Sequence, residues 1–281
     1  RPIKVPSVMR CASAYDIDID TVIRSINPRN FVTVFVAFLL EYKVAIVSSK
    51  ITAITVLGEI LKSIIAPLKY SHVFAPVLPK KLASELLECP TPFFVGIQRE
   101  SFDQASLPPD VFVLDLDSDT SRITPQLSKA LSVGRRLARA IDRVMRPSLH
   151  TCDDVIPGVE KHTCLHDVIR ICKTFMYDLL VGVEECCITV VDHNELVVMF
   201  DETMFSNYKY KHAKDSLFPY DKSFLEHFYR SQAFSTCVAG NFLQKMSPDS
   251  RPPSRPSSPY VSIPAPQSFV NAPPSTPTQS S

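Results

Sequence analysis

The sequence predicts an α/β protein in which a mostly parallel sheet has helices on both faces, followed by a smaller, mainly helical domain and a disordered tail. Three observations carry this prediction. Short runs of β-branched and aromatic residues alternate with amphipathic segments of helical spacing. Prolines stand between these runs, where they interrupt regular structure least. Residues 247–281 are mostly proline and serine, a composition that buries too little apolar surface to fold.

The first helix is expected to start at Asn27 and Pro28, which suit the cap and the first turn of a helix, and to run to about Tyr42. Residues 43–48 (KVAIVS) form a short, almost wholly apolar run. Such a run is typical of a parallel strand that is covered on both faces.

A second helix is predicted from Ile51 to Ala66, with Ser49 as its cap and Pro67 as its end. Three β-rich runs follow, with an amphipathic segment between the first two. They lie at residues 70–77, 92–97 and 111–117, and the amphipathic segment lies at residues 80–88. Strands that alternate with helices in this way favour parallel pairing.

Residues 125–146 are expected to form one amphipathic helix with an apolar face and a basic face. The basic face is lined by Lys129, Arg136, Arg139, Arg143 and Arg146. It is either a solvated surface or a contact for an acidic protein or lipid headgroups.

Residues 147–160 resemble a linker, so we predict three units: an α/β domain over 1–150, a helical domain over 151–246 and the tail over 247–281. Within the second unit, residues 165–183 and 223–243 have helical spacing. Residues 186–200 are expected to form a hairpin with a three-residue turn.

The tail carries Ser-Pro, Thr-Pro and Arg-x-x-Ser sequences and overlapping P-x-x-P motifs. The predicted phosphorylation sites are Ser247, Ser254, Ser258 and Thr276. The tail is either a target for kinases and SH3-type modules or a passive linker.

Composition excludes several classes of function. A formal net charge of +1 argues against nucleic-acid binding through bulk electrostatics. The six glycines are never closer than 24 positions, so no phosphate-binding loop can be built and no cofactor is expected. No G-x-S-x-G motif presents a nucleophilic serine. The eight cysteines are typical of free thiols in a reducing, cytoplasmic compartment, and no apolar run is long and clean enough to span a membrane.

One group of residues could suggest a metal site: Cys152, His162, Cys164 and His166. No C-x-x-C pair supports it, so we interpret these as ordinary residues of the linker region and expect no metal. The vicinal Cys186 and Cys187 are interpreted as small buried hydrophobic residues.

Asp115 and Asp117 stand at the end of the last predicted strand. At i and i+2 of a strand, two carboxylates share one face, and the carboxyl ends of parallel strands are where open α/β sheets keep their sites. The two residues either cap the following turn or contact a partner or substrate.

Four motifs in order resemble the central part of the DENN domain family. They are the E-x-x-V-x-x-x-S turn at 41–48, the proline-flanked region at 67–79, the PTPFFVG stretch at 90–96 and the VFVLDLD strand at 111–117. Residues 200–205 (FDETMF) and 223–238 are similar to the helical C-terminal (dDENN) part, although the β-like 186–191 segment departs from it. The family's N-terminal longin-like (uDENN) part is not visible in this sequence.

The resemblance implies guanine nucleotide exchange on a Rab-family small GTPase in vesicle trafficking, with no covalent chemistry and with peripheral membrane association at most. It also implies a partner-facing surface, for which Glu41, Asp115 and Asp117 are the candidates. The alternative is a non-catalytic DENN-like scaffold or regulatory module.

Overall fold

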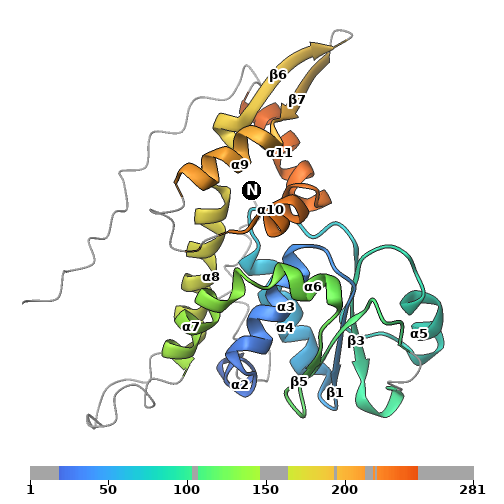
Figure 1. Ribbon diagram of the computed structural model, residues 1–281. Coiled ribbons are helices and arrows are strands. Elements are labelled where there is room, and N and C mark those ends of the chain that lie inside the picture. The colour runs from blue at the N-terminus through green and yellow to red at the C-terminus, as the bar shows by residue number, and fades with distance from the viewer. Residues whose placement is uncertain are drawn as a thin grey trace, which may run out of the picture.

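The computed structural model describes residues 19–102, 107–145, 164–192, 195–212, 218 and 220–245 (Figure 1). Within these residues the main sheet has the strand order β2–β3–β1–β4–β5. Its strands are β1 (Val44–Ser48), β2 (Val73–Ala75), β3 (Phe93–Gln98), β4 (Phe112–Asp115) and β5 (Thr120–Arg122). All neighbours are parallel except β4 and β5, which are antiparallel. The prediction of a mostly parallel sheet is confirmed.

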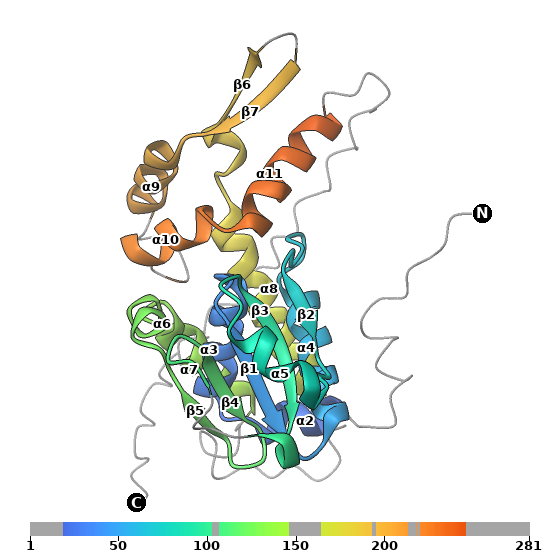
Figure 2. The same ribbon diagram turned by 90° about the vertical axis from the view of Figure 1, so that its right-hand side faces the viewer.

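Helices cover both faces of this sheet, as expected (Figure 2). The helices of this part are α2 (Ile19–Ser25), α3 (Pro28–Leu39), α4 (Ile51–Ile64), α5 (Lys80–Leu87), α6 (Pro125–Ala130) and α7 (Gly134–Met145). Of these, α3 and α4 pack on one face of the sheet and α5 on the other. In the central strand β1, Val44 and Ile46 join the large core that contains α3 and α4, whereas Ala45 and Val47 join a smaller core under α5. Every residue of β1 is buried, because alternate side chains face opposite helical layers.

The C-terminal part is mainly helical with one hairpin, as predicted. Its elements are α8 (Cys164–Leu180), β6 (Cys187–Asp192), β7 (Glu195–Phe200), α9 (Glu202–Lys211), α10 (Lys222–Tyr229) and α11 (Gln232–Lys245). Helix α8 packs against α7 and α4, and the hairpin extends away from the body in both views (Figures 1 and 2). One core cluster runs from Val22 to Val238, so the central and C-terminal parts share buried surface. The predicted boundary near residue 150 stays a prediction, since 146–163 are not described.

Two predicted helices are each divided in two. The 125–146 segment breaks between Ala130 and Gly134, which allows α6 to pack on α10 while α7 packs on α3 and α8. The 223–243 segment breaks at Arg230 and Ser231, and Ser231 Oγ accepts the backbone N–H of Phe234 at the start of α11. Periodicity alone did not reveal either break because the apolar positions on both sides remain buried.

Smaller expectations are also corrected. Helix α3 ends at Leu39 rather than near Tyr42, because Glu41 adopts a left-handed conformation with a φ of 56°. Ser49 does not cap α4, whose cap position is Lys50 without a side-chain hydrogen bond. In the hairpin, Asp192 pairs with Glu195, so two residues rather than three connect the strands.

The prolines around the third strand do mark element boundaries, as expected. Pro76 and Pro79 lie between β2 and α5, and Pro90 and Pro92 precede β3. A Cβ built on Gly96 in β3 would lie 2.0 Å from the carbonyl oxygen of Pro76, so the chain passes too close to allow any side chain at that position.

Lys209 is a buried cation of the C-terminal part. Its Nζ donates to the backbone carbonyl of Asp178 and lies 5.3 Å and 5.5 Å from the ring centroids of Phe205 and Tyr220. Burial lowers the pKa of Lys209 to about 8, although the Asp178 carboxylate acts in the opposite direction. The charged form is therefore less favourable in the folded protein than in the unfolded chain.

This imbalance predicts a pH-dependent stability. Below pH about 8, Lys209 is charged in both the folded and the unfolded state, and the full cost of burying its charge lowers the stability of the fold. Above that pH, the folded protein releases the Lys209 proton before the unfolded chain does, so this cost is progressively removed. The free energy of unfolding of the unmodified protein, measured relative to that of Lys209→Met, should rise by about 1–2 kcal/mol between pH ~7.5 and ~9.5. Urea unfolding across this range measures it, and a constant difference would contradict the assignment.

Candidate functional site

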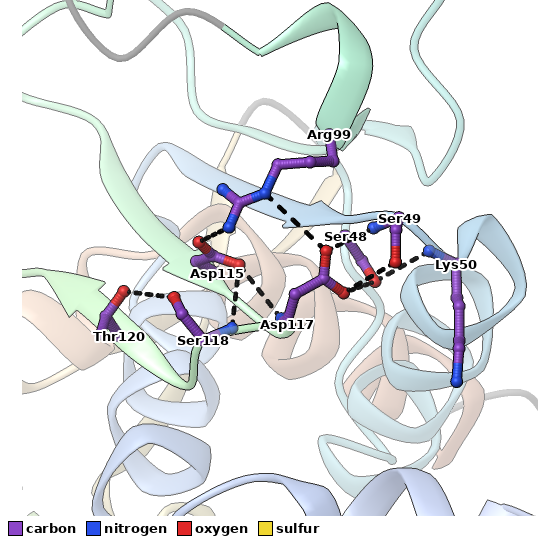
Figure 3. A network of polar contacts seen from close by, with 8 residues as sticks. All are labelled: Ser48, Ser49, Lys50, Arg99, Asp115, Asp117, Ser118 and Thr120. Atoms are coloured by element: carbon purple, nitrogen blue, oxygen red, sulfur yellow. Dashed lines mark hydrogen bonds and ion pairs between the residues drawn. The ribbon is translucent and has the colours of Figure 1, made fainter.

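The carboxyl ends of three neighbouring parallel strands meet at one edge of the sheet (Figure 3). Strand β1 lies between β3 and β4, so Ser48, Arg99 and Asp115 end or follow adjacent strands. This is the edge at which open α/β sheets place their sites. We call the polar cluster of Ser48, Ser49, Arg99, Asp115 and Asp117 the strand-end network.

Asp117 is the centre of the strand-end network. Its carboxylate accepts hydrogen bonds from Ser48 Oγ at 2.8 Å, from the Ser49 backbone N–H at 2.7 Å and from Ser49 Oγ at 3.2 Å. Ser48 Oγ in turn accepts the backbone N–H of Lys50 at 3.0 Å. Asp117 therefore accepts the hydrogen bonds that the chain donates where it leaves β1. Because the Ser49 hydroxyl is one of these donors, its side chain is not available as a helix cap.

Arg99 joins the two aspartates, as Figure 3 shows. One guanidinium nitrogen lies 2.6 Å from Asp115 Oδ2, and Nε lies 3.8 Å from Asp117 Oδ2. Asp115 also accepts the backbone N–H groups of Asp117 and Ser118 at 3.0 and 3.4 Å, which caps the turn after β4. The two carboxylates do lie together, but Asp117 belongs to that turn and not to the strand, which ends at Asp115.

The electrostatics favour the charged, hydrogen-bond-accepting form of Asp117. Burial raises the pKa of Asp117, but the hydrogen bonds from Ser48 and Ser49 and the charge of Arg99 outweigh it, so the pKa lies below the usual 3.8. The side chains of Asp115, Asp117 and Arg99 are 13%, 28% and 40% exposed. The network is a fixed, partly solvated polar surface.

Glu41 lies at the opposite end of β1. Its carboxylate accepts the backbone N–H groups of Gln232 and Ala233, both at 2.8 Å, and so caps α11 from a position far away in the sequence. His72 Nε2 lies 3.0 Å from the same carboxylate, which is 8% exposed. The structure thus does not bring Glu41 together with the two aspartates, and its role toward a partner stays a prediction.

Sequence reasoning missed Arg99, Ser48 and Ser49 as members of the strand-end network. Arg99 directly follows β3 just as Asp115 ends β4, so a signal existed, but using it requires the strand order. Asp119 was also missed: its carboxylate accepts the backbone N–H of Asn27 at 3.0 and 3.1 Å and the side-chain amide of Asn30 at 2.9 Å, which fixes the start of α3.

The other predicted sites are only partly covered by the described residues. Ser247, Ser254, Ser258 and Thr276, together with Cys152 and His162, lie outside them. Within the described residues, no cluster of histidine, cysteine, aspartate or glutamate could hold a metal ion. Cys186 is buried, as expected, whereas Cys187 is half-buried and its thiol donates to the Val183 carbonyl.

Comparison with known proteins finds a family match for part of the chain. The DENN (AEX-3) domain matches residues 3–119, a range that contains the sheet through β4 together with Glu41, Asp115 and Asp117. The similarity of the chain to the DENN domain family rests on this segment. Assignment of residues 151–246 to the family's C-terminal part stays a prediction.

Curated relatives match about half of the chain. A protein of Fusarium odoratissimum named "Elicitor of plant defense protein 1" is 35% identical over 132 residues, which are 47% of this chain and 14% of that protein. The protein of the same name from Gibberella zeae is 34% identical over 47% of this chain and 11% of its own length. Human "DENN domain-containing protein 2B" is 24% identical over 49% of this chain and 13% of its own. The matched segments are therefore small parts of these relatives.

The strand-end network predicts a specific loss of stability. Asp117→Ala should lower the free energy of unfolding by about 1–3 kcal/mol, because Ser48, the Ser49 amide and Arg99 all lose an acceptor in a partly buried position. Urea unfolding at neutral pH measures the loss. Asp110→Ala is the matched control: the Asp110 side chain is 49% exposed and pairs with Lys43, so its loss should remain within about 1 kcal/mol. Equal losses would show that Asp117 is an ordinary surface residue.

Proposed function

We propose that this chain is the GTPase-binding part of a guanine nucleotide exchange factor for a Rab-family small GTPase that acts in vesicle trafficking. The observation that carries the proposal is the DENN domain over residues 3–119, together with the similarity to human DENN domain-containing protein 2B. The DENN domain resemblance associates this fold with exchange on Rab proteins, which release GDP when their switch segments move away from the phosphates and magnesium.

The strand-end network supports docking rather than catalysis on a bound small molecule. Its two carboxylates are already engaged by Ser48, Ser49 and Arg99, which leaves neither of them as a free base or nucleophile. Exchange requires none, because no bond is made or broken. The factor binds the nucleotide-free GTPase more tightly than the loaded form, and linkage then weakens nucleotide binding by the same factor.

We place the partner at the carboxyl edge of the sheet. There Arg99 and Asp117 offer partly exposed charges of opposite sign that are held in position by neighbouring strands. Glu41 acts more indirectly in this proposal, because its enclosed carboxylate positions α11. Cytoplasmic location with peripheral association at vesicles fits this function, and none of the described helices has the length and apolar character needed to cross a bilayer. The proposed tail interactions with kinases or SH3-type modules would regulate it.

The exchange activity is tested by release of fluorescent GDP from a panel of Rab proteins. This chain, or a longer form with upstream sequence, should accelerate release from at least one member at substoichiometric concentration. Arg99→Glu should reduce the acceleration by about tenfold or more, because it reverses a charge at the docking edge. Arg143→Glu, an exposed arginine on α7, is the matched control and should change it less than about twofold.

Two other results would change the conclusion. Stable binding to a Rab protein without release would favour the alternative, a non-catalytic DENN scaffold. Absence of both binding and release across the panel, with either form of the protein, would overturn the proposed function.

A further inference from the structure

A cleft of about 770 Å³ opens between the first half of α3 and residues 134–142 of α7. It is separate from the strand-end network, although Asn27 in its lining donates its backbone N–H to Asp119 in the turn after β4. A cleft of this size lies within the range of natural ligand sites. Nothing in the proposed exchange activity uses it.

The floor of the cleft is apolar. Pro28, Val32 and Gly134 are buried there, and Leu131 and Ala138 are half-buried. A Cβ built on Gly134 would lie 3.0 Å from Val32 Cγ1, so α3 and α7 are in contact at the base. At the rim, Ile123 is 42% exposed and adds apolar surface beside the cleft.

The rim is basic. Arg29, Arg135 and Arg139 are exposed and line the cleft, against a single carboxylate, that of Asp142. Asp142 already has an interaction of its own. Because α7 begins at the cleft, the positive end of its dipole adds to the field of the three arginines, whereas the start of α3 is already engaged by the Asp119 carboxylate. The lining therefore favours a negatively charged occupant.

We propose that this cleft binds an acidic peptide segment of a partner protein, in which carboxylates flank one or two apolar side chains. The carboxylates would pair with Arg29, Arg135 and Arg139, whose planar guanidinium groups suit bidentate contact. The apolar side chains would cover Ile123 and the floor of the cleft. A bare lipid headgroup would satisfy the arginines but leave the apolar floor uncovered, so the combination favours a peptide.

The helix α7 provides an internal control for this proposal. Arg135 and Arg139 line the cleft, whereas Arg136 and Arg143 on the same helix are exposed but do not. Replacing either pair by glutamine removes the same charge from the same helix. If the peptide binds in the cleft, its affinity will fall for the pair that lines the cleft and not for the other pair. If it is attracted only to a basic surface, its affinity will fall equally for both pairs.

The experiment measures the fluorescence anisotropy of labelled peptides of about ten residues, with glutamates on both sides of a Leu-Phe pair, added to the whole chain. The double variant Arg135→Gln with Arg139→Gln should weaken binding about tenfold or more, and Arg136→Gln with Arg143→Gln less than about twofold. Circular dichroism and urea unfolding confirm that all proteins are folded. Ile123→Ser should weaken binding of the Leu-Phe peptide several-fold while leaving an all-glutamate peptide unchanged.

Three outcomes would overturn the proposal. They are equal losses in both arginine pairs, no measurable binding of any acidic peptide, and cleft-dependent binding only to vesicles that contain phosphatidylinositol bisphosphate. The assay contains no GTPase, so its failure leaves the exchange proposal unaffected, and failure of exchange leaves this one unaffected.

Discussion

The central strand of the sheet is held by a carboxylate at each end. Strand β1 is buried along its whole length between two helical layers, so the chain entering and leaving it can form polar contacts only at its ends. At the entry, Glu41 binds the first amides of α11 and lies beside His72; at the exit, Asp117 binds Ser48 and Ser49. The first contact joins the C-terminal helices to the sheet, and the second joins β1 to its neighbours β3 and β4 through Arg99 and Asp115.

This arrangement supports the proposed role of the protein in binding another protein. Acidic groups at the carboxyl edge of an α/β sheet often serve chemistry, but here they are engaged by hydroxyls, amides and a guanidinium. What they provide is a surface whose shape is fixed by adjacent strands. Packed elements also fix the surface at the cleft between α3 and α7, where two helices in contact hold three arginines around an apolar floor.

The order of β1 to β4 and of the helices between them could be predicted from the sequence, because burial on both faces produces short, continuous apolar runs such as 44–48 and 93–97. The breaks at 131–133 and 230–231 could not, because they depend on which helices each half must meet. The proximity of Asp115 and Asp117 was predictable from their spacing. Their partner Arg99 was not, because it becomes a neighbour only once β1 is placed between β3 and β4. The cap that Glu41 supplies to α11 joins positions 41 and 232, a separation beyond any local pattern.

Hydrogen–deuterium exchange tests the role of the Glu41 carboxylate most directly. In Glu41→Gln, the amides of Gln232 and Ala233 should exchange about tenfold faster or more, because they lose a charged acceptor, while the amide of Ser49 at the other end of β1 keeps its protection. If the start of α11 exchanges at the same rate in both proteins, Glu41 does not hold the C-terminal helices to the sheet, and the account of β1 as a strand fixed at both ends is wrong.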